Sequence, residues 1–221
     1  TRLRSIDVDV SKLMGIVVSH EHSDHLSGVG ILARKVRCPV WLTRGTFEAG
    51  LSKFKGRERI RFIDNDQAFS IGDLSFQPFA ISHDASDPVN FVVDDGQSRV
   101  GIATDMGTVS HLAYERLSTA DLVVLEANYD REMLMNGAYP WSLKQRINGS
   151  RGHLENSEAS ETLGRLIDNG LEQVVLAHLS EENNRPELAT AACRAVIEDR
   201  GLRQYQLSVA EQNHPTPIYV I

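Results

Sequence analysis

The sequence has few of the features that mark secreted or membrane proteins. It contains only two cysteines, Cys38 and Cys193, and they form no Cys-x-x-Cys pair. Each lies beside an apolar stretch, so we expect two buried free thiols. The longest apolar runs are far too short to cross a bilayer, and no secretion signal opens the chain. We therefore predict a cytoplasmic protein with no membrane partner.

Positive charge is also in deficit. The chain has 23 lysines and arginines against 30 aspartates and glutamates, which gives a formal net charge of −7. An acidic surface opposes an extended, non-specific grip on nucleic acid. Two basic stretches remain, at residues 34–37 and 53–61. Such runs are usually solvated faces, but the second could guide a nucleic-acid strand.

The length and composition predict a single globular domain spanning residues 1–221. The chain is 41% hydrophobic and 24% charged, and it shows no short-period repeat, low-complexity tract or linker. It begins at Thr1 without an initiator methionine, and its first strand-like run is followed at once by a histidine-rich loop. We expect that the first sheet is incomplete at the amino terminus.

Strand and helix patterns alternate along the chain. Apolar, β-branched runs at residues 15–19, 100–104 and 174–177 each lead into a polar loop, and residues 69–76 and 91–100 read as antiparallel hairpins. Helical spacing appears at residues 29–35, 111–117, 157–170 and 186–201, and we expect Ser157 to cap the third of these helices. In the last two helices the predicted inward-facing residues are Ala159, Leu163, Leu166 and Ile167, then Leu188, Ala192, Ala195 and Val196. The pattern predicts a layered α/β domain.

The loop at residues 20–25 carries the chemistry. It holds three histidines and an aspartate, which are ligand types that suit zinc, manganese and iron. In an extended loop alternate side chains point the same way, so His20 and His22 are predicted to serve one ion. Asp24 and His25 point elsewhere and are predicted to serve a second ion. Each half-site then needs further ligands from other loops.

Three residues at strand ends can supply those ligands. His83, Asp105 and His178 each close an apolar run, and layered α/β proteins bind ligands at such strand ends. A lone histidine after a strand is more often structural. Beside the dense loop, however, burying so many ionisable groups without a metal would leave costly unpaired polar atoms.

These residues resemble the His-x-His-x-Asp-His motif and the later His, Asp and His of the metallo-β-lactamase superfamily. The resemblance covers essentially the whole chain and implies an αββα sandwich that holds two divalent ions. Carried over, it implies that His20, His22 and His83 bind one ion, that Asp24, His25 and His178 bind the other, and that Asp105 bridges them.

Further segments resemble the YycJ/WalJ group of 5′-to-3′ exonucleases. They are residues 81–85, 103–107, 151–154 and 177–184. Glu155 departs from the group by placing an acid where a small polar residue is expected. The resemblance implies that His153 contacts the scissile phosphate or protonates the leaving group, with a structural role as the alternative. His111 and His214 are expected to be bystanders.

The expected reaction is metal-assisted hydrolysis of DNA. Two ions about 3.5–4 Å apart can hold a bridging hydroxide as the nucleophile, and Asp24 can orient or deprotonate the water. Arg151, Asn183 and Asn184 are candidate phosphate contacts. Ser110 and Ser180 lie near these loops but lack a Gly-x-Ser-x-Gly elbow, so we expect them to cap helices.

Other functions remain open on the sequence. A cyclic phosphodiesterase or a thioesterase of the glyoxalase II type would share the loop, and the acidic charge favours such a small-molecule hydrolase slightly. A diiron redox protein is a third reading, although no flavin-binding segment accompanies it. His25 argues against a classical β-lactamase, and the lack of a long insertion argues against transfer-RNA 3′ processing. A homodimer is left open, and no obligate protein partner is evident.

Overall fold

The first strand of the chain ends where the histidine loop begins. In the computed structural model, which describes residue 3 and residues 6–221, β1 (Ile16–Val17) lies parallel to β2 (Val40–Leu42), and β2 lies parallel to β3 (Ile60–Phe62). Parallel neighbours need crossover connections. α2 (Ser23–Leu26) and α3 (Val29–Val36) make the first crossover, and α4 (Arg44–Ala49) with η2 (Leu51–Lys53) makes the second. A 3-10 turn, η1 (Val10–Lys12), precedes β1.

A small core holds this sheet to its helices. Val18, Val40 and Leu42 pack with Leu26 of α2 and with Val29 and Ala33 of α3. The apolar positions of α3 are spaced one helical turn apart, which places them on the face toward the sheet. β4 (Phe69–Ile71) and β5 (Leu74–Ala80) follow as the predicted hairpin, and Gly72 supplies the positive φ of its turn.

A second sheet includes five strands that are neighbours in the order β10–β9–β8–β7–β6. Its strands are β6 (Val89–Asp94), β7 (Arg99–Ala103), β8 (Leu122–Glu126), β9 (Gln173–Ala177) and β10 (Gln206–Val209). β6 and β7 are antiparallel with Val93 opposite Val100, as predicted, and the others are parallel. Parallel strands bring the ends of β7, β8 and β9 to one edge, where Asp105, Glu126 and His178 lie.

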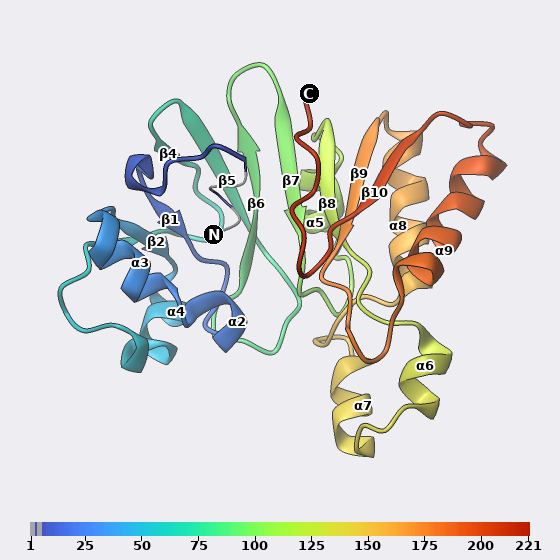
Figure 1. Cartoon of the computed structure of the whole chain (residues 1–221), viewed down its shortest axis with the longest axis horizontal. Helices are drawn as coiled ribbons and strands as arrows, with labels where there is room; N and C mark the ends of the chain where they lie inside the picture. The colour runs from blue at the N-terminus through green and yellow to red at the C-terminus, as the bar shows by residue number, and fades with distance from the viewer. Residues whose placement is uncertain (1–2, 4–5) are drawn as a thin grey trace. The chain divides into compact units, whose positions relative to one another are not determined.

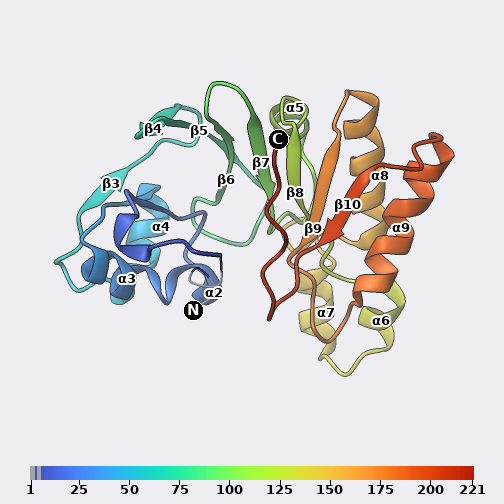
Figure 2. The ribbon, with the colours of Figure 1, turned by 45° about the horizontal axis from the view of Figure 1, so that its top comes forward.

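Helices connect the strands of this second sheet. They are α5 (His111–Leu117), α6 (Arg131–Asn136), α7 (Trp141–Ile147), α8 (Asn156–Asp168) and α9 (Pro186–Asp199). Figures 1 and 2 both show α8 and α9 side by side along β9 and β10. Ser110 caps α5 through a bond from the Ala113 amide to its Oγ, as predicted.

Three local predictions were wrong. Glu155, not Ser157, caps α8, because Glu155 and Glu158 form a reciprocal capping box. Ser180 lies six residues before α9 begins at Pro186 and caps no helix; its Oγ instead accepts a hydrogen bond from the Asn183 amide. In α9 the buried stripe is Ala189, Cys193 and Ile197, one position along from the predicted stripe. The α9 prediction failed because almost every face of that helix carries alanine, so periodicity alone does not choose between them.

The chain divides into two compact units. The first comprises Thr1–Ala80 and Asp84–Asn90, and the second comprises Ile81–His83 and Phe91–Ile221. Organisation as a single domain stays a prediction. Cys38 in the first unit and Cys193 in the second are buried free thiols, as expected, and burial raises the pKa of Cys193 to about 12. Within the described part of the chain, no helix is long and apolar enough to cross a membrane.

Candidate metal centre

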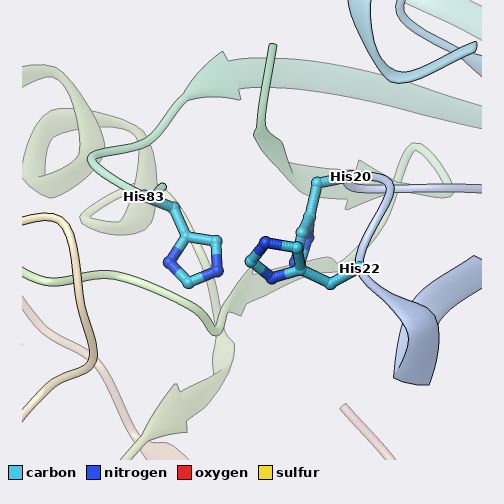
Figure 3. Close-up of side chains that lie close together, drawn as sticks. All are labelled: His20, His22 and His83. Atoms are coloured by element: carbon cyan, nitrogen blue, oxygen red, sulfur yellow. The ribbon is translucent and has the colours of Figure 1, made fainter. Parts of the chain in front are cut away.

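The first unit carries one set of candidate ligands on the segment after β1. Figure 3 shows His20 and His22 on this loop, and His83 on the loop that follows β5. The ring centroids of His20 and His22 lie 4.6 Å apart, and those of His20 and His25 lie 4.1 Å apart. The side chains of the loop therefore converge, as the sequence predicts for His20 and His22.

The second half of the loop is helical, which the sequence interpretation missed. Residues Ser23–Leu26 form α2, so Asp24 and His25 are not part of an extended segment. His25 Nε2 lies 3.3 Å from Asp24 Oδ2, and His22 Nε2 lies 3.7 Å from Asp84 Oδ1. Asp24 and His25 therefore differ in direction from His22 because they lie on a helical turn, and not because side chains alternate along an extended segment.

Ser19 contacts two of these imidazoles, and its place before the loop was the only signal that could have singled it out. Its Oγ lies 3.0 Å from Nδ1 of His20 and 3.0 Å from Nδ1 of His25. A histidine whose Nδ1 is held by the protein can offer Nε2 to a metal. Ser19 thus engages Nδ1 of both candidate ligands.

The second unit gathers ligands from four loops around Asp105. Oδ1 of Asp105 lies 3.6 Å from His178 Nδ1, 3.8 Å from His153 Nδ1 and 3.8 Å from His83 Nε2. His83 and Asp105 are each 2% exposed. Single ligand atoms of Asp105, Glu126, His153 and His178 all lie within 4.8 Å of one another, which is the spacing of a metal-binding group.

Glu126 is the functional residue that sequence reasoning missed. It closes β8, and its side chain is fully buried. Its Oε1 accepts hydrogen bonds from Nδ1 of His153 and Nδ1 of His178, both at 2.8 Å. Its Oε2 accepts from the amides of Met106 and Leu154. An acid that ends a run of four apolar residues was the available signal.

These bonds keep Glu126 ionised. Burial alone would raise its pKa, but the hydrogen bonds from His153 and His178 outweigh burial and hold the pKa below its usual value. Because a carboxylate only accepts hydrogen bonds, the two histidines carry their protons on Nδ1. His83 is fixed in the same sense, since its Nδ1 lies 3.0 Å from the Gly152 carbonyl oxygen.

This donor set fits a divalent metal. Two buried carboxylates, Asp105 and Glu126, lie among imidazoles whose Nδ1 atoms are already engaged. Buried negative charge needs a cation or hydrogen bonds to offset its desolvation. Imidazole Nε2 and carboxylate oxygen, with second-shell partners that fix the rings, are what zinc and similar ions require.

The backbone is strained at two candidate ligands. Among the described residues, only Asp7, Arg37, Asp105 and His178 are non-glycine residues with positive φ, and Asp105 and His178 have φ of 59° and 57°. The left-handed region costs an L residue roughly 1–2 kcal/mol. Strain of this kind clusters at functional sites, where the surrounding structure imposes it.

Two glycines allow the loops of the second unit to approach closely. A Cβ added at Gly107 would lie 2.4 Å from the Gly152 amide nitrogen, and one at Gly152 would lie 2.1 Å from the Ile147 carbonyl oxygen. Both contacts are with backbone, which cannot swing away as a side chain can. Gly107 therefore lets the Asp105 loop lie against the His153 loop, and Gly152 lets the His153 loop lie against the end of α7.

The predicted substrate contacts differ in their surroundings. Arg151 donates from Nε and Nη2 to the His83 carbonyl oxygen, so it also holds the loop of a candidate ligand. Asn183 and Asn184 are buried, and Asn184 Nδ2 donates to Ala127 and Asn156. The predicted bystanders His111 and His214 are exposed, and each pairs with a nearby glutamate.

The sequence profile of the beta-lactamase superfamily domain matches residues 2–179. The chain belongs to this superfamily, and the predicted family is confirmed.

Two bacterial proteins are similar to this chain over most of its length. The chain is 32% identical to the exodeoxyribonuclease YycJ of Bacillus anthracis, over 99% of this chain and 84% of the relative. It is 38% identical to the exodeoxyribonuclease WalJ of Streptococcus pneumoniae, over 85% of this chain and 71% of the relative.

Solved structures share the fold. The metallo-beta-lactamase fold protein YhfI from Bacillus subtilis aligns with a TM-score of 0.71 at 19% identity, covering 96% of this chain and 81% of its own. A diphosphatase of the PhnP family aligns with a TM-score of 0.62 at 15% identity, covering 92% and 69%. The predicted mixed α/β fold of the metallo-β-lactamase type is thus confirmed, and the chain is a metal-dependent hydrolase.

Proposed function

We propose that this hydrolase is an exodeoxyribonuclease that degrades DNA in the 5′-to-3′ direction with two divalent ions. The names of the two relatives, which match most of the chain, support DNA as the substrate. The observation that carries the proposal is the buried group around Asp105. Three imidazoles surround its carboxylate, and each has Nδ1 held by the protein.

We assign the ligands by joining the two sets of loops. One ion would be held by His20, His22 and His83 and the other by Asp24, His25 and His178, with the Asp105 carboxylate available to both. The assignment follows the superfamily motif, and the ring-fixing bonds of Ser19, Gly152 and Glu126 support it. The bound ions, zinc or manganese, would supply Lewis-acid charge that activates water and neutralises the phosphoryl oxygens.

The chain's own residues orient water and move the proton. Asp24, whose side chain is 62% exposed, is the carboxylate that orients the attacking water. His153 keeps one proton on Nδ1 against Glu126. Because Glu126 engages Nδ1, Nε2 is the ring nitrogen from which His153 would protonate the leaving oxygen.

Three residues are proposed to hold the phosphate. Arg151 uses Nε and Nη2 on the His83 carbonyl oxygen, which leaves Nη1 as the donor for substrate. Asn183 Nδ2 is buried and has no hydrogen-bond partner among the described residues, so it is the amide donor best suited to a ligand. For Asn184, a phosphate contact through Nδ2 would require its bonds to Ala127 and Asn156 to break.

The test is a substrate panel with manganese- or zinc-loaded protein. We expect single- and double-stranded DNA to lose mononucleotides from the 5′ end, with the 3′-labelled product shortening stepwise. His178→Ala should abolish this activity, whereas His111→Ala, an exposed histidine, should retain it. Intact DNA beside rapid hydrolysis of a cyclic phosphodiester, thioester or lactone would overturn the proposal in favour of a small-molecule hydrolase.

A further inference from the structure

A cavity in the first unit is lined by four arginines. It has a volume of about 670 Å³, and Arg34, Arg37, Arg57 and Arg59 surround it together with Ala33, Cys38 and Glu58. We call these four arginines the arginine cluster. They come from the end of α3 and from the segment that leads into β3, two parts of the chain about 20 residues apart.

The cluster is held in place by a buried glutamate. The Glu58 side chain is 1% exposed, it pairs with Arg34, and its Oε2 accepts the amides of Lys55 and Arg57 at 3.0 Å. Gly30 lets this segment lie against α3, since an added Cβ would be 2.9 Å from the Lys53 carbonyl oxygen. Arg59 in turn donates to the Arg37 carbonyl oxygen. The cavity is therefore built by specific contacts.

The local charge is opposite to that of the whole chain. Residues 34–61 contain nine lysines and arginines against two glutamates, while the chain as a whole has a net charge of −7. Glu58 is the one acid lining the cavity, and it is already bonded to Arg34. Within the described part of the chain, neither Arg37 nor Arg57 has an acidic partner. A dense positive patch of this kind attracts a polyanion.

The arginine cluster lies at the amino ends of the strands of its sheet, whereas the histidine loop lies at the carboxyl end of β1. β1, β2 and β3 are parallel, with Ile16 beside Val40 and Val40 beside Ile60. His20 follows β1 at its carboxyl end, whereas Arg37 and Arg57 precede β2 and β3. At about 3.3 Å a residue, the two places are on the order of 20 Å apart along the strands. A phosphate at the cluster is therefore not the one that reacts.

We propose that the arginine cluster binds the phosphodiester backbone of a nucleic-acid strand at a distance from the reacting phosphate. The identity of the polyanion rests on the proposed nuclease function, but the charge and the cavity do not. The competing explanation is that Arg57 and Arg59, just before the edge strand β3, prevent that strand from pairing with other chains. In that case the arginines would contribute to solubility and not to binding.

The experiment measures binding without cleavage. The double variant Arg37→Gln/Arg57→Gln is compared with Lys12→Gln/Arg203→Gln, which removes two exposed cations elsewhere. Anisotropy of a labelled 30-nucleotide DNA strand is followed in EDTA over a range of salt concentrations. Each lost phosphate contact on a single strand lowers the salt slope by about 0.7. We expect the cluster variant to bind about tenfold more weakly and to lose about 1.4 from its slope, with little change in the control.

A kinetic ratio gives the second readout. For metal-loaded protein, the kcat/KM for the 30-nucleotide strand relative to that for bis(4-nitrophenyl) phosphate should fall about tenfold in the cluster variant. Equal affinity and slope in both double variants would overturn the inference even if DNA is cleaved. If DNA is not cleaved but the cluster variant still loses affinity, the proposed function fails and the polyanion site stands.

Discussion

His178 Nδ1 lies 2.8 Å from Oε1 of Glu126, and this bond fixes which imidazole nitrogen His178 can offer to a metal. The same carboxylate oxygen holds His153 at the same distance. Because Glu126 is fully buried and ionised, it orients two rings at once and leaves Nε2 of each to act. A residue that touches no substrate thus sets the geometry of the centre.

Glu126→Gln tests this role. A glutamine side chain carries no charge, so it holds the two imidazoles more weakly than the Glu126 carboxylate does. We therefore expect zinc affinity to fall about 10- to 100-fold. Unfolding free energy should fall by about 1–3 kcal/mol, since buried donors lose their acceptor. Competition with a chromogenic chelator gives the affinity, and Glu161→Gln on the exposed face of α8 is the control. Unchanged zinc affinity in Glu126→Gln would remove the positioning role.

Asp105→Ala should abolish binding of both ions and hydrolysis, because its carboxylate is the shared centre of the second unit. Alanine at a φ of 59° is also strained, so Asp105→Asn, which tolerates this region, separates loss of metal from loss of fold. Elemental analysis after dialysis is the measurement, with exposed Asp199→Ala as the control. Two ions and full turnover in Asp105→Ala would contradict the bridging assignment.

Gly107→Ala should displace the His153 loop. Its Cβ would meet the Gly152 amide nitrogen at 2.4 Å and the Ser150 carbonyl oxygen at 2.5 Å, and overpacking of this kind costs about 1–3 kcal/mol. Urea unfolding and zinc affinity should both weaken. Gly28→Ala, where no atom lies within 4 Å of the added Cβ, should change neither. Equal behaviour of the two variants would show that the close approach of the loops is not required.

The pH dependence of the unfolding free energy of Glu58→Gln tests whether the charge of Glu58 holds the arginine cluster in place. Burial would raise the pKa of Glu58, but its hydrogen bonds to backbone amides and Arg34 hold the pKa below its usual value. A carboxyl with a lowered folded pKa stabilises the protein above its unfolded pKa, about 4.3, and loses this effect as pH falls through the folded pKa. We expect Glu58→Gln to cost about 2 kcal/mol at pH 7.

The cost of Glu58→Gln should shrink as the pH falls below about 4.3, where the carboxyl of the unfolded chain takes up a proton, and should be smallest below the lowered pKa of the folded state. Urea unfolding from pH 7 downwards gives the free-energy difference at each pH at which both proteins are folded. Glu48→Gln, an exposed acid on α4, is the control. A difference that stays constant or grows in acid would show that the Glu58 charge is not what holds the segment.

Local pattern predicted several elements of the fold. The runs before His20, Asp105 and His178 are strands, and the helix predicted at residues 111–117 is α5. These succeed because alternation and helical spacing are set by neighbours in sequence. The prediction for the cap of α8 failed because the reciprocal pairing of Glu155 and Glu158 was not considered. The prediction for α9 failed because the buried face of an alanine-rich helix is decided by what packs against it.

The sequence by itself determined the chemistry of this protein: a dense His/Asp loop and three further ligand candidates at strand ends, which are the groups a divalent metal needs. Only the tertiary structure decided how those groups are held. Ser19, Gly152 and Glu126 fix the imidazole rings, and Gly107 lets two loops meet. Glu126 and His178 are 52 residues apart in the chain, and their bond exists because β8 and β9 are parallel neighbours that end at the same edge. The periodicity of apolar residues predicts where a strand lies in the sequence, but it does not predict which strands become neighbours in the sheet.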